Sequence, residues 1–189
     1  MLLFLRSMKI DIIDATPQNA ELISNIVLRA LDIESNPTPE MIHSCSQNNT
    51  LYSWEHTRLA SIDGEIVGGL ISYGGANYAE MRLQTWKHFW ELSTEILDSI
   101  LPECGAGEYY LDSMVLAPKS RGLGIGKILI ADALELARQK GYTLATLLVS
   151  LEKPALMEYY KQIGFFPMGR LRFMGQEHQK MAISIVANL

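Results

Sequence analysis

The chain has 189 residues, a formal net charge of −5 and a hydrophobic content of 48%. This length is enough for one domain with a full core, and we expect residues 1–189 to form a single domain. The acidic balance argues against a nucleic-acid partner, which needs clustered basic residues, and weakly favours cationic amine partners.

The first seven residues are apolar, but they are too few for a secretion signal or for a helix that crosses a bilayer. Because a strand pattern begins at Met8, we expect residues 1–7 to be a disordered or non-native extension, and we expect no membrane partner. The two cysteines, Cys45 and Cys104, are far apart, which fits free thiols and a cytoplasmic location. No Cys/His spacing is typical of a metal site, so we expect no metal.

One strand and two helices are predicted in the first fifty residues. Residues 9–13 alternate as in a strand. Thr16-Pro17 and Thr38-Pro39 each place a capping hydroxyl before a proline at the first helical position, which is a helix start signal. The second of these helices is expected to end near Ser46.

A β-hairpin is predicted next, with strands over residues 52–62 and 65–73. Asp63-Gly64 between them is typical of a two-residue hairpin turn. Gly68-Gly69 inside the second strand indicates a bulge or a close approach of another backbone.

Aromatic and apolar side chains recur at helical spacing within residues 77–101, at Trp86, Phe89, Trp90, Ser93 and Leu97. We expect these residues to pack in the core or to form a homodimer contact, rather than to line a substrate pocket. Residues 102–107 are predicted to be a loop.

The second half of the chain alternates strands and helices. Its predicted elements are a strand over 109–116, a helix over 127–140 that Gly141 ends, a strand over 144–149, a helix from Pro154 to Gly164, and closing strands over 165–173 and 178–186. The order of strands and helices along the chain predicts an α/β fold of the mixed α+β kind. Its centre would be a twisted, mixed and mostly antiparallel sheet of six to seven strands flanked by helices.

The most informative motif lies between the strand over 109–116 and the helix that follows it. Glycines alternate with other residues over 122–126, so the backbone is bare where a helix begins. Unpaired N–H groups and the positive end of the helix dipole favour a phosphate at such a place. Arg121 and Lys127 add cationic side chains at the two ends of the loop.

Two nucleotide-binding motifs do not fit this loop. A P-loop needs a glycine at the position of Arg121 and a Ser or Thr at the position of Ile128. A dinucleotide fingerprint would need a third glycine at Lys127 or at Leu129. A nucleotide-binding function is therefore the least favoured of the interpretations.

The spacing Arg-x-x-Gly-x-Gly, from Arg121 to Gly126, resembles the acetyl-CoA pyrophosphate loop of the GNAT N-acetyltransferase superfamily. The run over 110–118, which a proline closes, resembles strand four of that family, and Tyr160 to Phe165 resembles its Tyr-x-x-x-Gly-Phe segment. The resemblance is specific over about 108–166. Lys153 stands seven residues before the tyrosine, where the family often has Asn.

The resemblance implies a role for each part of this segment. It implies acetyl-CoA as co-substrate, held by the loop residues and by the end of the strand: Met114, Val115, Leu116, Arg121, Gly122, Leu123, Gly124, Ile125, Gly126 and Lys127. It implies a backbone N–H of Val115 or Leu116 as donor to the developing oxyanion. Tyr160 would protonate the leaving thiolate, since a phenol can donate to a thiolate whose conjugate acid has a pKa near 8.5.

The base that takes the amine proton is left open by the sequence. Asp112 and Glu108 lie four residues apart on one strand, and therefore on one face, and either could act directly or through water. Glu103 in the preceding loop is a third candidate. We expect an N-acetyltransferase acting on a small-molecule or peptide primary amine by direct attack in a ternary complex. The alternative is a non-catalytic acetyl-CoA-binding sensor or scaffold module.

Overall fold

The computed structural model describes residues 8–173 and 175–185. Its strands form one sheet in the order β1-β2-β3-β4-β5-β7-β6. These strands are β1 (Ile10–Asp14), β2 (Thr57–Ile62), β3 (Glu65–Gly74), β4 (Tyr109–Leu116), β5 (Leu144–Ser150), β6 (Phe166–Phe173) and β7 (Gln176–Ser184). Within this described sheet, β4 and β5 are parallel and the other neighbouring pairs are antiparallel. The predicted mixed, mostly antiparallel sheet is confirmed.

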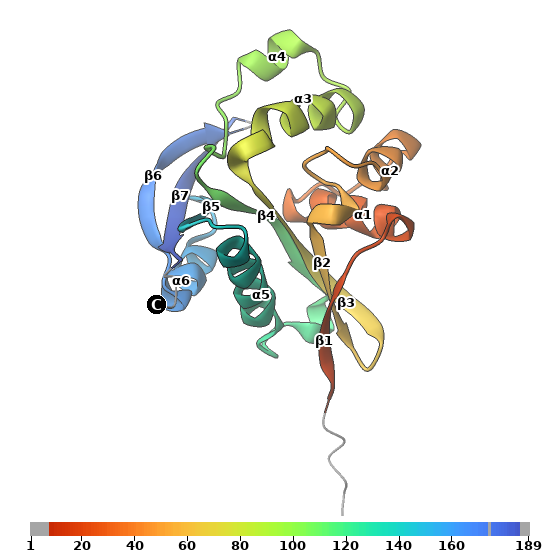
Figure 1. Ribbon diagram of the computed structural model, residues 1–189, viewed down its shortest axis with the longest axis vertical. Helices are drawn as coiled ribbons and strands as arrows, with labels where there is room; N and C mark the ends of the chain where they lie inside the picture. The colour runs from red at the N-terminus through yellow and green to blue at the C-terminus, as the bar shows by residue number, and fades with distance from the viewer. Residues whose placement is uncertain (1–7, 174, 186–189) are drawn as a thin grey trace, which may run out of the picture.

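Helices cover both faces of the sheet (Figure 1). They are α1 (Ala20–Ala30), α2 (Pro39–Ser46), α3 (Tyr78–His88), α4 (Thr94–Asp98), α5 (Ile125–Gln139) and α6 (Pro154–Ile163), with short 3₁₀ turns at η1 (Pro17–Asn19), η2 (Trp54–His56), η3 (Gly75–Asn77) and η4 (Pro118–Ser120). Helices α1, α2 and α3 pack on one face, whereas α5 and α6 pack on the other. In the described residues, no helix has the length and apolar character that a membrane crossing needs.

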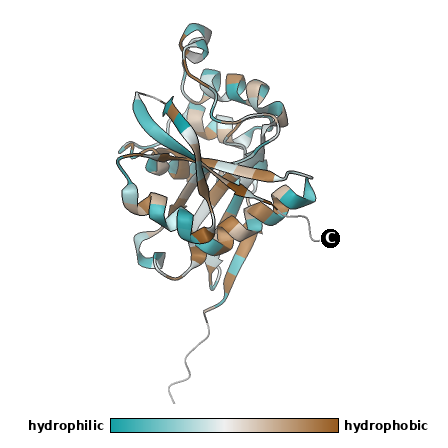
Figure 2. Cartoon of the chain, turned by 90° about the vertical axis from the view of Figure 1, so that its left-hand side faces the viewer, coloured by the Kyte–Doolittle hydropathy of each residue, from teal (hydrophilic) through white to brown (hydrophobic). Residues whose placement is uncertain are grey.

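The alternation of side chains along the strands divides the core into two apolar layers. Ile71 and Tyr110 belong to the layer beneath α1 and α2, while Leu70 and Tyr109 belong to the layer beneath α5. Figure 2 shows the result, with apolar strands inside the molecule and hydrophilic residues on the outward surfaces of the helices.

The predicted hairpin is confirmed in its turn and in its irregular strand. Asp63 and Gly64 both have positive φ, at 49° and 88°, as a tight two-residue turn requires. The register between β2 and β3 shifts at Ala60, and a side chain at Gly68 would overlap the carbonyl oxygen of Val115 on β4. Gly68 therefore allows the close backbone approach that the sequence indicated.

The first strand of this hairpin is shorter than predicted. It begins at Thr57 instead of residue 52, because residues 54–56 form the turn η2. The Ser53 hydroxyl accepts a hydrogen bond from the N–H of Glu55 at 3.2 Å and caps this turn. A local cap therefore prevails over the strand pattern of the preceding residues.

The aromatic segment forms two helices rather than one. Helix α3 ends at His88, and Glu91 adopts a left-handed conformation with φ of 53°, which breaks the helical path before α4 begins. Trp86 and Phe89 are each only 1% exposed, so the prediction of core packing is confirmed for these two side chains. The homodimer contact stays a prediction.

Small differences remain at the ends of other elements. The first strand begins and ends one residue later than predicted, and α5 begins at Ile125, two residues earlier than predicted. The final strand is β7 (Gln176–Ser184), whereas residues 178–186 were expected. Val186 and residues 1–7 lie outside the described residues.

Candidate active site

The candidate active-site pocket opens where β4 and β5 separate. These parallel strands pair only at Tyr109 with Ala145 and at Tyr110 with Thr146. Beyond this point the two strands no longer form a ladder, and a cavity of about 1060 Å³ lies between them. Leu148 of β5 lines one side of it, and the predicted strand residues Met114, Val115 and Leu116 of β4 line another. Ligand pockets are typically about 300–1,000 Å³, so this one has room for a large ligand.

The glycine loop forms one end of this pocket. Gly122 and Gly124 have φ of 79° and 80°, and Gly124 is the N-cap of α5. These left-handed positions favour glycine and turn the chain into the helix, whose N-terminal residues from Gly124 to Lys127 line the cavity. Of the ten residues predicted to hold acetyl-CoA, nine line the pocket; Leu123 does not, and its side chain is exposed.

One of the two predicted oxyanion donors is directed into the gap. The N–H of Ala117 donates to the carbonyl of Val67 on β3 at 2.7 Å. Backbone groups alternate in direction along an antiparallel strand. The N–H of Val115 is therefore directed at β3 as well, and that of Leu116 is directed to the opposite side, toward the pocket. Strand geometry thus favours Leu116 over Val115.

Tyr160 lines the pocket from α6, together with its neighbour Tyr159. The Tyr160 side chain is 8% exposed, and its ring packs edge-on against Phe165, with ring centroids 5.6 Å apart. Burial raises the pKa of Tyr160 above its ordinary value, with a smaller contribution from Tyr159. The phenol therefore keeps its proton at neutral pH and has one to donate.

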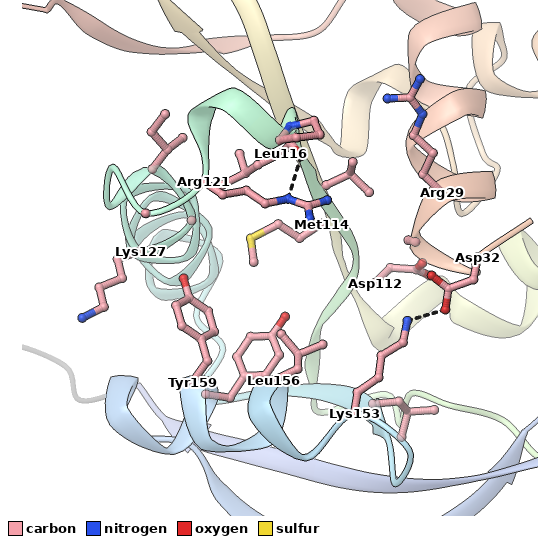
Figure 3. A pocket seen from close by; sticks show the side chains of 18 of the residues that line it. Arg29, Asp32, Asp112, Met114, Leu116, Arg121, Lys127, Lys153, Leu156 and Tyr159 are labelled. Atoms are coloured by element: carbon pink, nitrogen blue, oxygen red, sulfur yellow. Dashed lines mark hydrogen bonds and ion pairs between the residues drawn. The ribbon is translucent and has the colours of Figure 1, made fainter.

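Asp112 reaches the same pocket from β4 (Figure 3). It accepts a hydrogen bond from the Tyr73 hydroxyl at 2.5 Å and another from the Ser113 hydroxyl at 2.8 Å. Burial raises the pKa of the Asp112 carboxyl, and these two hydrogen bonds act against that rise. A carboxylate with a raised pKa is a better proton acceptor near neutral pH.

The other two candidate bases do not line the pocket. Glu108 forms an ion pair with Lys180 at 2.6 Å and accepts a hydrogen bond from the Thr146 hydroxyl at 2.7 Å. Glu103 is buried and accepts a hydrogen bond from the Tyr110 hydroxyl at 2.9 Å. Burial, and then the charge of Asp112, raise the pKa of Glu103 to about 8.

Several residues of the pocket were not singled out from the sequence. Arg29, Asp32 and Glu34, at and after the end of α1, line the rim opposite α6. Asp32 forms an ion pair with Lys153 at 2.5 Å, which joins the two walls of the pocket (Figure 3). No local motif marks these residues, because their relation to the pocket arises only when α1 packs against β4.

The chemistry of the pocket follows from these positions. One end offers backbone N–H groups with Arg121 and Lys127, which suits a phosphate. The interior offers a proton acceptor at Asp112 and a proton donor at Tyr160. The described residues contain no cluster of three or more His, Cys, Asp or Glu side chains suited to a metal ion.

The chain matches a family model described as "Acetyltransferase (GNAT) family" over residues 27–165. A comparison with curated proteins finds no match.

Several solved structures share the fold. An N-acetyltransferase from Staphylococcus aureus Mu50 superimposes with a TM-score of 0.72 at 19% identity, over 92% of this chain and 100% of that one. The ribosomal-protein-S18-alanine N-acetyltransferase from Escherichia coli has a TM-score of 0.62 at 14% identity, over 96% and 99% of the two chains. The paia N-acetyltransferase from Thermoplasma acidophilum, in complex with coenzyme A, has a TM-score of 0.57 at 17% identity, over 94% and 99%. At these identities the likeness concerns the fold.

Proposed function

The chain belongs to the GNAT family of acetyltransferases, and from this premise we propose that it is an N-acetyltransferase that acts on a primary amine. The observation that carries the proposal is the pocket between β4 and β5. It combines a glycine loop at a helix N-terminus with Asp112 and Tyr160 in one cavity. In the proposed reaction the amine attacks the acetyl group directly in a ternary complex, and no nucleophile of the protein takes part.

Acetyl-CoA, when bound, supplies the acetyl group as a thioester. The loop from Arg121 to Lys127 would hold its pyrophosphate through backbone N–H groups and the two cationic side chains. Residues 114–116 would hold its pantetheine arm where β4 has lost its partner strand. The Leu116 N–H would stabilise negative charge on the carbonyl oxygen.

Two side chains handle the protons of the reaction. Asp112 takes a proton from the acceptor amine, directly or through a water molecule, and so leaves a lone pair free to attack. Tyr160 donates its proton to the thiolate that leaves. An acceptor ammonium loses two protons on the way to the amide. Asp112 takes the first before attack, and the second leaves the nitrogen after attack and replaces the proton that Tyr160 gave to the thiolate. The products are an amide, a free thiol and a protonated Asp112, which returns its proton to water. Glu108 has no role in this proposal, because Lys180 and Thr146 hold its carboxylate outside the pocket.

The acceptor is a small molecule or a peptide with a free amine. A protein N-terminus is one class to test, since the E. coli enzyme of the same fold is described as acting on an alanine of ribosomal protein S18. A cationic small amine is another, because Asp32, Glu34 and Asp112 all line the pocket. We also propose a cytoplasmic location, which suits the free thiols of Cys45 and Cys104.

A direct test is an acetylation screen read out by thiol release. Purified protein is incubated with acetyl-CoA and a panel of polyamines, amino acids, lysine peptides and N-terminal peptides. We expect amine-dependent release of free thiol with at least one class, and a mass increase of one acetyl group on that acceptor. Binding of acetyl-CoA without turnover on any class would instead support a sensor or scaffold module.

A further inference from the structure

The Asp112 carboxylate is held on both of its oxygens. The Tyr73 hydroxyl donates to Oδ2 at 2.5 Å, and the Ser113 hydroxyl donates to Oδ1 at 2.8 Å. A carboxylate that accepts one fixed donor on each oxygen has its plane and direction defined. In Figure 3 it extends from β4 toward the end of α1, where Asp32 lies.

An irregularity in the sheet makes this arrangement possible. On β4, Ser113 is opposite Ile71 and Leu111 is opposite Ser72, so Asp112 is an extra residue between two consecutive pairs. Such a bulge redirects side chains, and bulges are frequent beside active sites. It brings the neighbouring side chains of Asp112 and Ser113 together, although neighbours on a regular strand point to opposite faces.

Tyr73 itself is a rigid donor. Its side chain is 0% exposed and lies outside the pocket. Its ring packs against Tyr78 and Tyr110, with centroids 6.3 and 5.8 Å away, and against His56 at 5.7 Å. The hydroxyl at the end of this packed ring therefore has one direction available, which is toward Asp112.

We propose that Tyr73 is a positioning residue for the reaction, which orients the Asp112 carboxylate toward the acceptor amine and keeps it ionised. The inference rests on the proposed function, in which Asp112 is the base. A donor to a carboxylate favours the charged form, whereas burial disfavours it. Tyr73 thus opposes the burial that raises the pKa of Asp112.

Other titratable groups also surround this carboxylate. From the core side these are Tyr52, His56, Tyr78, Glu103 and Tyr110. The pocket that it enters is lined by further titratable or charged residues: Arg29, Asp32, Glu34, Arg121, Lys127, Lys153, Tyr159 and Tyr160. Tyr73→Phe removes one hydroxyl and leaves the chemistry of all these groups unchanged. A change in the titration of Asp112 in that variant therefore reports on the lost donor.

The test is the pH profile of kcat/KM for the acceptor amine in Tyr73→Phe. We expect a fall of at least tenfold at neutral pH and a shift of the acidic limb to higher pH by about one unit, because the ionised form of Asp112 loses a hydrogen-bond donor. The KM for acetyl-CoA should not change, because Tyr73 does not line the pocket. Ser113→Ala removes the other donor and should shift the limb in the same direction.

The matched control is Tyr110→Phe, which removes the same hydroxyl from an equally buried ring. Tyr110 donates to Glu103 and not to Asp112, so its variant should show no shift toward higher pH. A wild-type pH profile in Tyr73→Phe would overturn the proposal, whatever Ser113→Ala shows. An equal shift in Tyr110→Phe would overturn it as well. Absence of amine acetylation by the wild-type protein would instead reject the proposed function itself.

Discussion

The hydroxyl of Tyr159 lies 2.6 Å from the position that a Cβ atom at Gly126 would occupy. The two residues come from different helices, α6 and α5, and both line the pocket. A contact of this length is too short for a carbon atom, so a side chain at Gly126 would displace Tyr159. Gly126 therefore leaves room for Tyr159 in addition to baring the helix N-terminus. This contact with Tyr159 requires glycine at position 126, and the spacing of the glycines in the loop does not predict it.

Gly126→Ala should weaken acetyl-CoA binding by roughly tenfold, about 1.4 kcal/mol, because the methyl group forces Tyr159 to shift within the pocket. Stability should change little, since the better helix propensity of Ala offsets part of this cost. The measurement is calorimetric titration with acetyl-CoA. In a Tyr159→Phe background, which removes the clashing oxygen, the same substitution should cost much less. An equal loss in both backgrounds would show that the contact is not the cause.

Gly124→Glu should abolish measurable acetyl-CoA binding while the protein still folds. The new side chain meets open space, but it adds a negative charge to the proposed phosphate site. Its φ of 80° carries a strain of about 1–2 kcal/mol. Gly141→Glu is the control, because Gly141 has a φ of 81°, an equally open surrounding and no place in the pocket. Unchanged affinity in Gly124→Glu would rule out the loop as the phosphate site.

Tyr160→Phe should lower turnover by roughly 10²–10⁴-fold, the usual range for a lost general acid. Acetyl-CoA affinity should hardly change, since the ring and its packing on Phe165 remain. Steady-state kinetics and calorimetry together separate these effects. Tyr159→Phe should be much less harmful; if it is the more harmful variant, then Tyr159 is the acid.

Lys153→Gln should lower the KM for a cationic acceptor several-fold. It frees Asp32 from its ion pair, and a unit charge about 4 Å away in water is worth about 1 kcal/mol. Stability should change by less than about 1 kcal/mol, because the pair is solvent-exposed. Lys161→Gln makes the same change in net charge within α6, the helix that Lys153 precedes, and Lys161 pairs with Glu158 outside the pocket. The effect should be absent in this control, and it should shrink at high salt.

Glu103→Gln should become progressively more stabilising as the pH rises from about 5 to 8. The folded-state pKa of Glu103, about 8, is raised above its unfolded value. The carboxyl therefore contributes fully to the free energy of unfolding below its unfolded-state pKa. This contribution is lost as the pH rises through the folded-state pKa, at about 1 kcal/mol per pH unit. Urea unfolding across this range measures it.

Glu135→Gln is the control for that series, since Glu135 is exposed and its Arg138 partner lowers its pKa to about 2. The contribution of Glu135 to the free energy of unfolding is already complete above pH 5. The difference in that free energy between Glu135→Gln and the wild-type protein should therefore not change between pH 5 and 8. A parallel dependence of wild-type protein and Glu103→Gln on pH would contradict the raised pKa.

Local signals were sufficient for much of the fold. The turn at Asp63-Gly64, the helix start at Thr38-Pro39 and the glycines at 122 and 124 were all predicted, because each depends on the backbone preferences of a few consecutive residues. The sheet class followed from the order of the elements. Prediction was wrong where two local signals compete, as at residues 52–56, where the cap by Ser53 forms a 3₁₀ turn in place of a strand.

The residues of the site also fall into those that the sequence predicted and those that it could not predict. The loop is contiguous in the sequence, so its residues could be named without a structure. The surroundings of the carboxylates could not, because they join distant segments: Tyr73 with Asp112, Lys180 with Glu108, and Lys153 with Asp32. Strand alternation placed Asp112 and Glu108 on one face, so the sequence could not distinguish between them as the general base. Because β4 separates from β5 after Tyr110, Asp112 lies in the pocket, whereas Glu108 lies next to the residues at which the two strands are still paired.

The sequence by itself therefore indicated the family, through the resemblance of its motifs. It also determined the sheet class and the glycine loop, since these depend on the order of elements and on short-range backbone geometry. Tertiary structure alone decided which carboxylate faces the pocket and which hydroxyls hold it. The physical reason is that a bulge at Asp112 and the loss of pairing after Tyr110 arise from contacts between strands, and no periodicity along a single strand encodes them.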